Sequence, residues 1–107
     1  MPINDLYNVS VKSVTVKGII LYIKKAGNVI AINMSGDTTE LITANTSILN
    51  LTDALNVATF ADVIIVTGQR VVASDLNKSL FFATDIPSGT RIRGSITYAS
   101  FNYTPLS

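Results

Sequence analysis

The sequence contains no histidine, no cysteine and no tryptophan. Without an imidazole, the chain lacks the usual general base and the usual nitrogen ligand for a metal, and Ser-His or Cys-His nucleophiles are excluded. Without cysteine, it has no disulfides and no thiolate chemistry, and a zinc site would need carboxylate ligands alone. We therefore expect a protein that is not an enzyme, with no catalytic residues, no bound metal and no cofactor.

Charged side chains are also scarce. They make up 14% of the 107 residues, whereas a typical soluble domain has about 25%. The net charge of +1 gives a field too weak to attract nucleic acid or an acidic membrane. Serine, threonine and asparagine cover the surface instead of lysine and glutamate, which are depleted at protein interfaces. This composition predicts a protein that assembles with other subunits.

Long apolar segments are missing as well. The first five residues, Met-Pro-Ile-Asn-Asp, have neither the basic start nor the apolar run of a secretory signal. The most apolar stretch, residues 63–66, is far shorter than the roughly 20 residues that a membrane helix needs. We expect a protein that folds in the cytoplasm where it is made, without a membrane partner and without secretion through a signal peptide.

What the sequence does have is alternation of β-branched and polar residues, which indicates strands with one buried face. Apolar residues alternate from Tyr7 to Val11 and again from Val14 to Val16, with a change of phase between the two segments. That change predicts a bulge or a short corner at residues 12–13. The unbroken apolar run at residues 19–23 predicts a strand that is covered on both faces.

Turn residues separate the other segments. Gly27 and Asn28 can both take positive φ and predict a hairpin. Residues 45–56 predict at most one or two helical turns, capped by Ser47 or Thr52. We expect further strands at residues 29–34, 38–43, 57–60, 63–67, 70–73, 80–84 and 91–98, with turns at residues 35–37, 68–69, 74–78 and 86–89.

Eight or nine short strands with almost no helix are typical of an antiparallel sandwich or barrel. The length suits one domain. We therefore predict that residues 1–107 form a single all-β domain, an antiparallel β-sandwich of the jelly-roll type, with an OB-like barrel as the alternative.

The last predicted strand alternates most regularly. Ile92, Gly94, Ile96 and Tyr98 share one face, and Arg91, Arg93, Ser95 and Thr97 share the other. Two guanidinium groups on one face suit bidentate pairing with carboxylates or carbonyls of a partner. The candidate partner-interface residues are Arg91, Arg93, Tyr98, Phe101 and Tyr103.

Two binding alternatives involve other residues. An OB-like barrel that binds single-stranded nucleic acid would use exposed aromatic and basic side chains, and the candidates are Tyr22 with Lys24 and Lys25, and Arg91 and Arg93 near Tyr98. The simpler interpretation is that the lysines flank a hairpin turn. Asp37 and Glu40 could share a calcium ion, but their spacing matches no known calcium loop.

The segment from Ile86 to Thr97 reads Ile-Pro-Ser-Gly-Thr-Arg-Ile-Arg-Gly-Ser-Ile-Thr. It resembles the Pro-x-Gly-Thr and Gly-x-Ile-Thr pattern near the end of small virion proteins of tailed phages. In this pattern Pro87 and Gly89 set the turn, and Gly94 lets another chain segment approach the strand.

The resemblance implies a capsid decoration or cement protein. Such a protein is assembled in the host cytoplasm into the virion, binds the major capsid protein or other virion proteins, and is often a homotrimer. A fibre-tip domain that binds a receptor or glycan is a further alternative.

Overall fold

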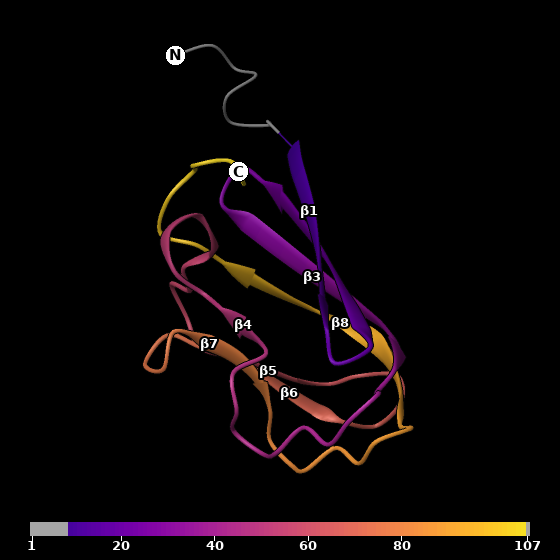
Figure 1. The fold of residues 1–107 in the computed structure, drawn as a ribbon. Coiled ribbons are helices and arrows are strands. Elements are labelled where there is room, and N and C mark those ends of the chain that lie inside the picture. The colour runs from indigo at the N-terminus through magenta and orange to yellow at the C-terminus, as the bar shows by residue number, and fades with distance from the viewer. Residues whose placement is uncertain (1–8, 107) are drawn as a thin grey trace.

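The computed structural model of the protein describes residues 9–106, which form two four-stranded antiparallel sheets packed face to face (Figure 1). The predicted all-β sandwich is thereby confirmed. Within the described part, no helix is long and apolar enough to cross a bilayer. The first sheet has the order β1-β2-β3-β8, with β1 at Val9–Val16, β2 at Ile19–Ala26, β3 at Val29–Asp37 and β8 at Arg91–Ala99. The second has the order β4-β7-β6-β5, with β4 at Leu49–Asn50, β5 at Ala61–Ile64, β6 at Arg70–Ser74 and β7 at Ser79–Phe82; a single 3-10 turn, η1, spans Asp53–Leu55.

The connections differ from those of a jelly roll. In the second sheet β5, β6 and β7 follow one another and β4 lies beside β7, which is the order of a Greek key. In the first sheet β1, β2 and β3 form a meander and β8 is added next to β3. A jelly roll combines two Greek keys, so only half of that topology is present.

Two tight hairpins build the meander. Lys17 and Gly18 join β1 to β2 with φ of 49° and 90°, and this pair of positive values is that of a type I′ turn. The predicted hairpin at Gly27 and Asn28 joins β2 to β3, and only Gly27 has a positive φ. The first hairpin was not predicted, because the apolar residues that follow Gly18 hide the turn.

β1 is continuous and has no bulge. Lys12 pairs with Ile23 and Ser13 with Tyr22 in an unbroken register, so the predicted bulge or corner at residues 12–13 is wrong. The change of phase in the sequence arises because β1 carries valines on both faces: Val14 and Val16 pack against the core, whereas Val9 and Val11 are exposed. Tyr7, the expected start of this strand, lies outside the described residues.

Three other expectations are corrected. Residues 35–37 are not a turn but the end of β3, where Gly36 approaches the carbonyl oxygen of Gly18 so closely that a Cβ would lie 2.3 Å from it. Residues 38–43 contain only an isolated bridge, between Ile42 and Ile86, instead of a strand. Residues 57–60 form no strand, and the amide of Ala58 donates to the carbonyl of Ala99 at 2.8 Å.

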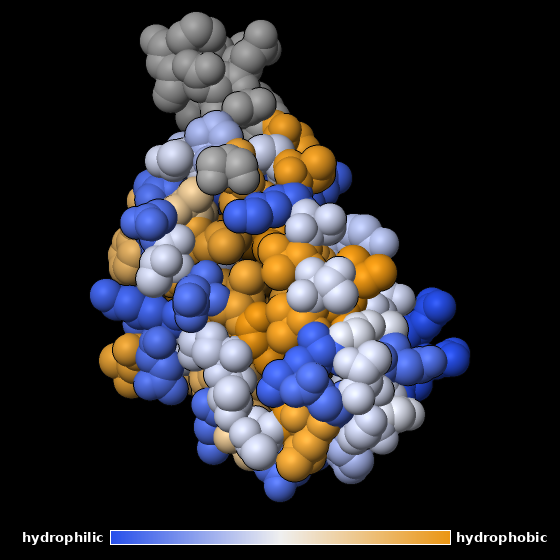
Figure 2. Space-filling model, in the orientation of Figure 1, coloured by the Kyte–Doolittle hydropathy of each residue, from blue (hydrophilic) through white to orange (hydrophobic). Residues whose placement is uncertain are grey.

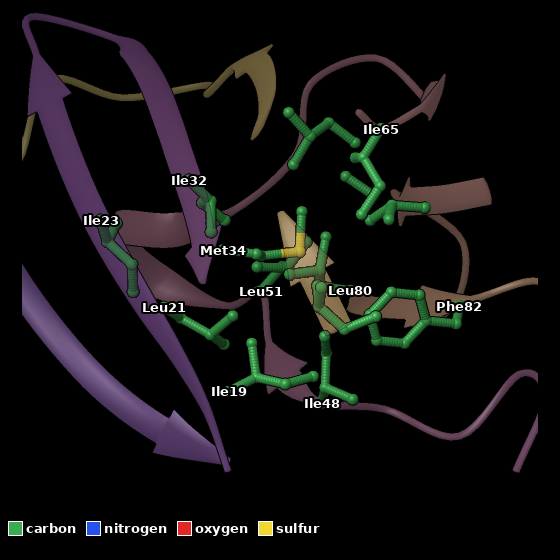
Figure 3. Close-up of a cluster of buried hydrophobic side chains, with 14 of the residues drawn as sticks. Ile19, Leu21, Ile23, Ile32, Met34, Ile48, Leu51, Ile65, Leu80 and Phe82 are labelled. Atoms are coloured by element: carbon green, nitrogen blue, oxygen red, sulfur yellow. The ribbon is translucent and has the colours of Figure 1, made fainter. Parts of the chain in front are cut away.

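The core lies between the two sheets. Figure 3 shows Leu21 and Met34 of the first sheet pointing toward Leu80 and Phe82 of the second. Loop residues close the cluster, among them Ile48, Leu51 and Ile65. Only one face of β2 is buried: Tyr22 is half exposed, so the prediction of a strand covered on both faces is wrong.

β8 shows the predicted alternation and a close contact at Gly94. Ile92, Ile96 and Tyr98 are buried, and Arg91 and Arg93 are exposed. A Cβ on Gly94 would lie 2.3 Å from the Cβ of Ile65, so this glycine admits the loop after β5 onto the strand, as predicted. Gly89, with a φ of 83°, donates its amide to the carbonyl of Thr38 at 2.7 Å and fixes the turn before β8.

Candidate protein-binding face

The side of the β1-β2-β3-β8 sheet that points away from the core is exposed, and we call it the outer face. The strand register places its residues in rows of four across β1, β2, β3 and β8. The first row is Val9, Ala26, Val29 and Ala99; the second is Val11, Lys24, Ala31 and Thr97; the third is Ser13, Tyr22, Asn33 and Ser95; the fourth is Thr15, Ile20, Ser35 and Arg93.

The first three rows are apolar or uncharged apart from Lys24. Val11 is 74% exposed and Tyr22 is 50% exposed, although both are large apolar residues. A shallow hollow of about 450 Å³ lies around Val11, Tyr22 and Asn33. Exposed apolar residues that are contiguous on one face are typical of an interaction surface. With Lys24 as the single charge in its first three rows, such a surface suits contact with another protein over a broad, flat area.

Charges gather at the other end of the first sheet. Arg91 donates from Nε to Oδ1 of Asp37 at 3.0 Å, and the Lys17 ammonium lies 3.7 Å from Oε1 of Glu40. Asp37 and Glu40, the residues considered for calcium, therefore each face a basic side chain. No group of three or more acidic side chains that could hold a metal ion occurs within residues 9–106.

Arg93 is the arginine that remains available. Its backbone is anchored, because its amide donates to the hydroxyl oxygen of Thr67 at 3.0 Å and its carbonyl accepts the Thr67 amide at 3.2 Å. Its side chain is exposed and has no ion pair with any other described residue. Arg93 thus presents a guanidinium group on the outer face from a fixed backbone.

Tyr98, a predicted interface residue, lies inside the molecule. It is 5% exposed, and its hydroxyl donates to the carbonyl of Leu55 at 2.7 Å. Burial raises the pKa of this phenol far above its usual value. The folded domain does not offer Tyr98 to a partner, so its assignment as a contact residue is wrong. Its place on the face shared with Ile92 and Ile96 was the signal for burial.

Lys25, a candidate nucleic-acid contact beside the predicted hairpin turn, is also buried. It is 1% exposed, and its ammonium group donates to three oxygen atoms: the carbonyls of Ala54 and Thr104, each at 2.7 Å, and Oδ1 of Asn102 at 3.0 Å. Desolvation lowers the pKa of this lysine. The side chain fastens η1 and the C-terminal segment to β2. The signal for its burial was its position two residues after Ile23, on the same face of the strand.

Phe101 and Tyr103, the remaining predicted contact residues, follow β8 and are exposed at 75% and 53%. Asn56 holds the start of this segment: its Oδ1 accepts from the Ser100 hydroxyl at 2.6 Å and from the Phe101 amide at 2.8 Å. Phe101 also borders an open cavity of about 670 Å³ next to η1. The aromatic ring is therefore displayed from an anchored backbone.

The candidate site thus consists of the outer face, Arg93 at its charged end and the two aromatic residues after β8. It offers an apolar contact area, hydroxyl and amide groups for hydrogen bonds, and very few charges. An apolar area with uncharged hydrogen-bonding groups is suited to binding the surface of another protein. Comparison with protein-family models and with curated proteins finds no match to this chain.

Proposed function

We propose that this chain is a structural protein that binds other protein surfaces through its outer face. The observation that carries the proposal is the exposure of Val11, Tyr22 and Val29 on one sheet face whose first three rows hold a single charge. Burying these side chains against a partner is favourable by about 25 cal/mol per Å² of apolar area. Lys24 is the only ion in those rows that must be desolvated.

We further propose that the partner is the surface of a phage head, to which the protein binds as a decoration or cement protein. The resemblance of residues 87–97 to the pattern in tailed-phage virion proteins supports this setting. Gly89 forms the turn before β8 and Gly94 admits Ile65 against the strand. The partner is then the major capsid protein or a neighbouring virion protein.

The nucleic-acid alternative loses part of its basis in this fold. Lys25 and Tyr98, two of its candidate contacts, are buried and hydrogen bonded inside the domain. Tyr22 and Lys24 remain exposed, but together they supply one positive charge on the first three rows of the outer face. A salt-dependent nucleic-acid site needs several phosphate contacts.

The test is binding to heads of the phage whose genome carries this chain, measured by co-sedimentation with the purified protein. Val29→Lys places a charge on the first row of the outer face, on β3. Val66→Lys makes the same change at a site that is 87% exposed on the loop after β5. Both positions are exposed, so neither change is expected to alter stability by more than about 0.5 kcal/mol.

We expect the wild type and Val66→Lys to bind heads equally and Val29→Lys to bind at least tenfold more weakly. Equal binding by both variants would show that the outer face is not the contact. Absence of wild-type binding to heads, together with salt-sensitive anisotropy changes for single-stranded oligonucleotides, would replace the proposal with the nucleic-acid alternative.

A further inference from the structure

β1 is the outermost strand of the first sheet, and its free side has no partner within residues 9–106 (Figure 1). It pairs with β2 over all eight of its residues. No backbone hydrogen bond joins it to any other described segment. Its sequence, Val-Ser-Val-Lys-Ser-Val-Thr-Val, has a high β propensity and one charge. A strand of this kind is a template for pairing with another chain.

The other sheet edges differ from β1. On the free side of β8, Ala58 and Thr67 cover the backbone near the two ends of the strand. The edges of the second sheet are formed by β4, which has two residues, and β5, which has four. Asp62 of β5 also carries an ion pair with Arg70. Short, charged or covered edges are the usual protection against sheet extension. Within residues 9–106, β1 is long and uncovered, and Lys12 is its only charge.

The turn identifies the backbone groups that β1 offers. In a two-residue hairpin the residues flanking the turn, Val16 and Ile19, form a hydrogen-bonded pair. Because bonding alternates along an antiparallel strand, Val14, Lys12 and Ser10 also bond to β2. The N–H and C=O groups of Val9, Val11, Ser13 and Thr15 then point toward the free side.

We propose that two copies of this chain pair through β1, antiparallel and about a two-fold axis at Ser13, to form one continuous eight-stranded sheet. Such an axis is perpendicular to the sheet, so residues on the same face of each β1 lie opposite one another. Ser13 then faces Ser13 of the second copy, and Val11 faces its Thr15. Each of these pairs can exchange two backbone hydrogen bonds.

Lys12 disfavours one neighbouring register. Moving the axis from Ser13 to residue 12 would place the two Lys12 side chains directly opposite, and like charges in that position are unfavourable. With the axis at Ser13, Lys12 lies opposite Val14 of the second copy. The outer faces of both copies become one surface. The hollow of about 310 Å³ that residues of β1, β4 and η1 line stays on the inward side, and Figure 2 shows apolar surface at the centre of the molecule in this view.

The inference goes beyond the proposed function, because it concerns contact between two copies and its test uses no capsid. Light scattering coupled to size exclusion should give twice the 11.4 kDa mass of one chain at about 100 μM. A two-fold contact yields a dimer instead of the trimer that the family resemblance implies, so the mass distinguishes the two. A monomer or a trimer in this measurement would overturn the proposal.

Cysteine cross-linking tests the register, and the chain has no native cysteine to interfere. In the proposed pairing the two Ser13 Cα atoms are about 5.5 Å apart, within the roughly 4.4–6.8 Å range of disulfides. The two Thr15 Cα atoms are offset by four residues, about 13 Å. Ser13→Cys should therefore give at least tenfold more covalent dimer under mild oxidation than Thr15→Cys, its matched control.

Equal cross-linking of the two variants, or none by either, would show that any dimer uses a different surface. The wild-type mass measurement remains decisive if a variant fails to fold. Loss of head binding by Val29→Lys with an unchanged dimer would separate the capsid contact from the β1 contact. The head-binding assay therefore tests the proposed function, and the mass and cross-linking measurements test the β1 contact, each independently of the other.

Discussion

Gly94→Ala tests the packing on which β8 depends. The new Cβ would lie 2.3 Å from Cβ and 2.8 Å from Cγ2 of Ile65, which is itself 4% exposed and enclosed by the core. Forcing an extra methyl group into such a site costs about 1–3 kcal/mol. The φ of +154° at Gly94 is unfavourable for an alanine, which adds about 1 kcal/mol or more. We expect the free energy of unfolding to fall by about 3 kcal/mol.

Gly89→Ala is the matched control. Gly89 has a φ of +83°, but a Cβ there would meet nothing within 4 Å, so this variant reports backbone strain alone, about 1 kcal/mol. Urea denaturation followed by circular dichroism measures both variants. Ile65→Gly combined with Gly94→Ala should be less destabilised than the sum of the single changes. A Gly94→Ala variant no less stable than Gly89→Ala would refute the proposed contact.

Two buried polar groups give further predictions. Lys25→Met leaves the carbonyls of Ala54 and Thr104 without their donor, so we expect a loss of about 3 kcal/mol in urea denaturation and faster proteolysis of residues 100–106. Because the pKa of Lys25 is lowered in the folded state, wild-type stability should rise with pH just below the unfolded value of 10.5, and Lys25→Met should remove that rise. Burial raises the pKa of Tyr98, so its phenol ionises in the unfolded chain but not in the folded one as the pH passes 10.0. The free energy of unfolding should therefore fall above that pH. Tyr98→Phe should abolish this alkaline loss at a cost of about 1 kcal/mol from the bond to Leu55, and an unchanged alkaline slope would show that another group is responsible.

Much of the fold follows from local patterns in the sequence. The alternation in β8, the hairpin at Gly27 and the buried run in β7 are each visible in a short window of residues. In these segments turn chemistry and side-chain periodicity agree, so the local preference and the final structure coincide.

The failures occur where two patterns overlap or where contacts are distant in sequence. The pattern in β1 predicts a change of phase only if all its valines are taken as buried, whereas Val9 and Val11 are exposed. Gly36 was interpreted as a turn residue, although it serves a close approach to Gly18 across the sheet. The burial of Lys25 depends on acceptors 29 to 79 residues away, which no local window contains.

The candidate site was predicted in part. The exposed arginine side of β8 and the exposed aromatic residues after it were identified from alternation. The apolar rows of the outer face were not, because the registers between β1, β2 and β3 were unknown and bring Val11 next to Lys24 and Ala31. Pairwise register is a property of the folded sheet, and it decides which exposed residues become neighbours.

The contact between Leu106 and β1 has a practical consequence for labelling. The Leu106 amide donates to the hydroxyl oxygen of Ser10 at 2.9 Å, so any tag fused after this segment emerges beside the strand proposed to pair. Such a tag would obstruct pairing through β1, so a tagged protein would run as a monomer even if the untagged protein dimerises. A fluorophore or short epitope inserted at Leu76, which is 87% exposed in the β6–β7 turn of the second sheet, leaves the first sheet free.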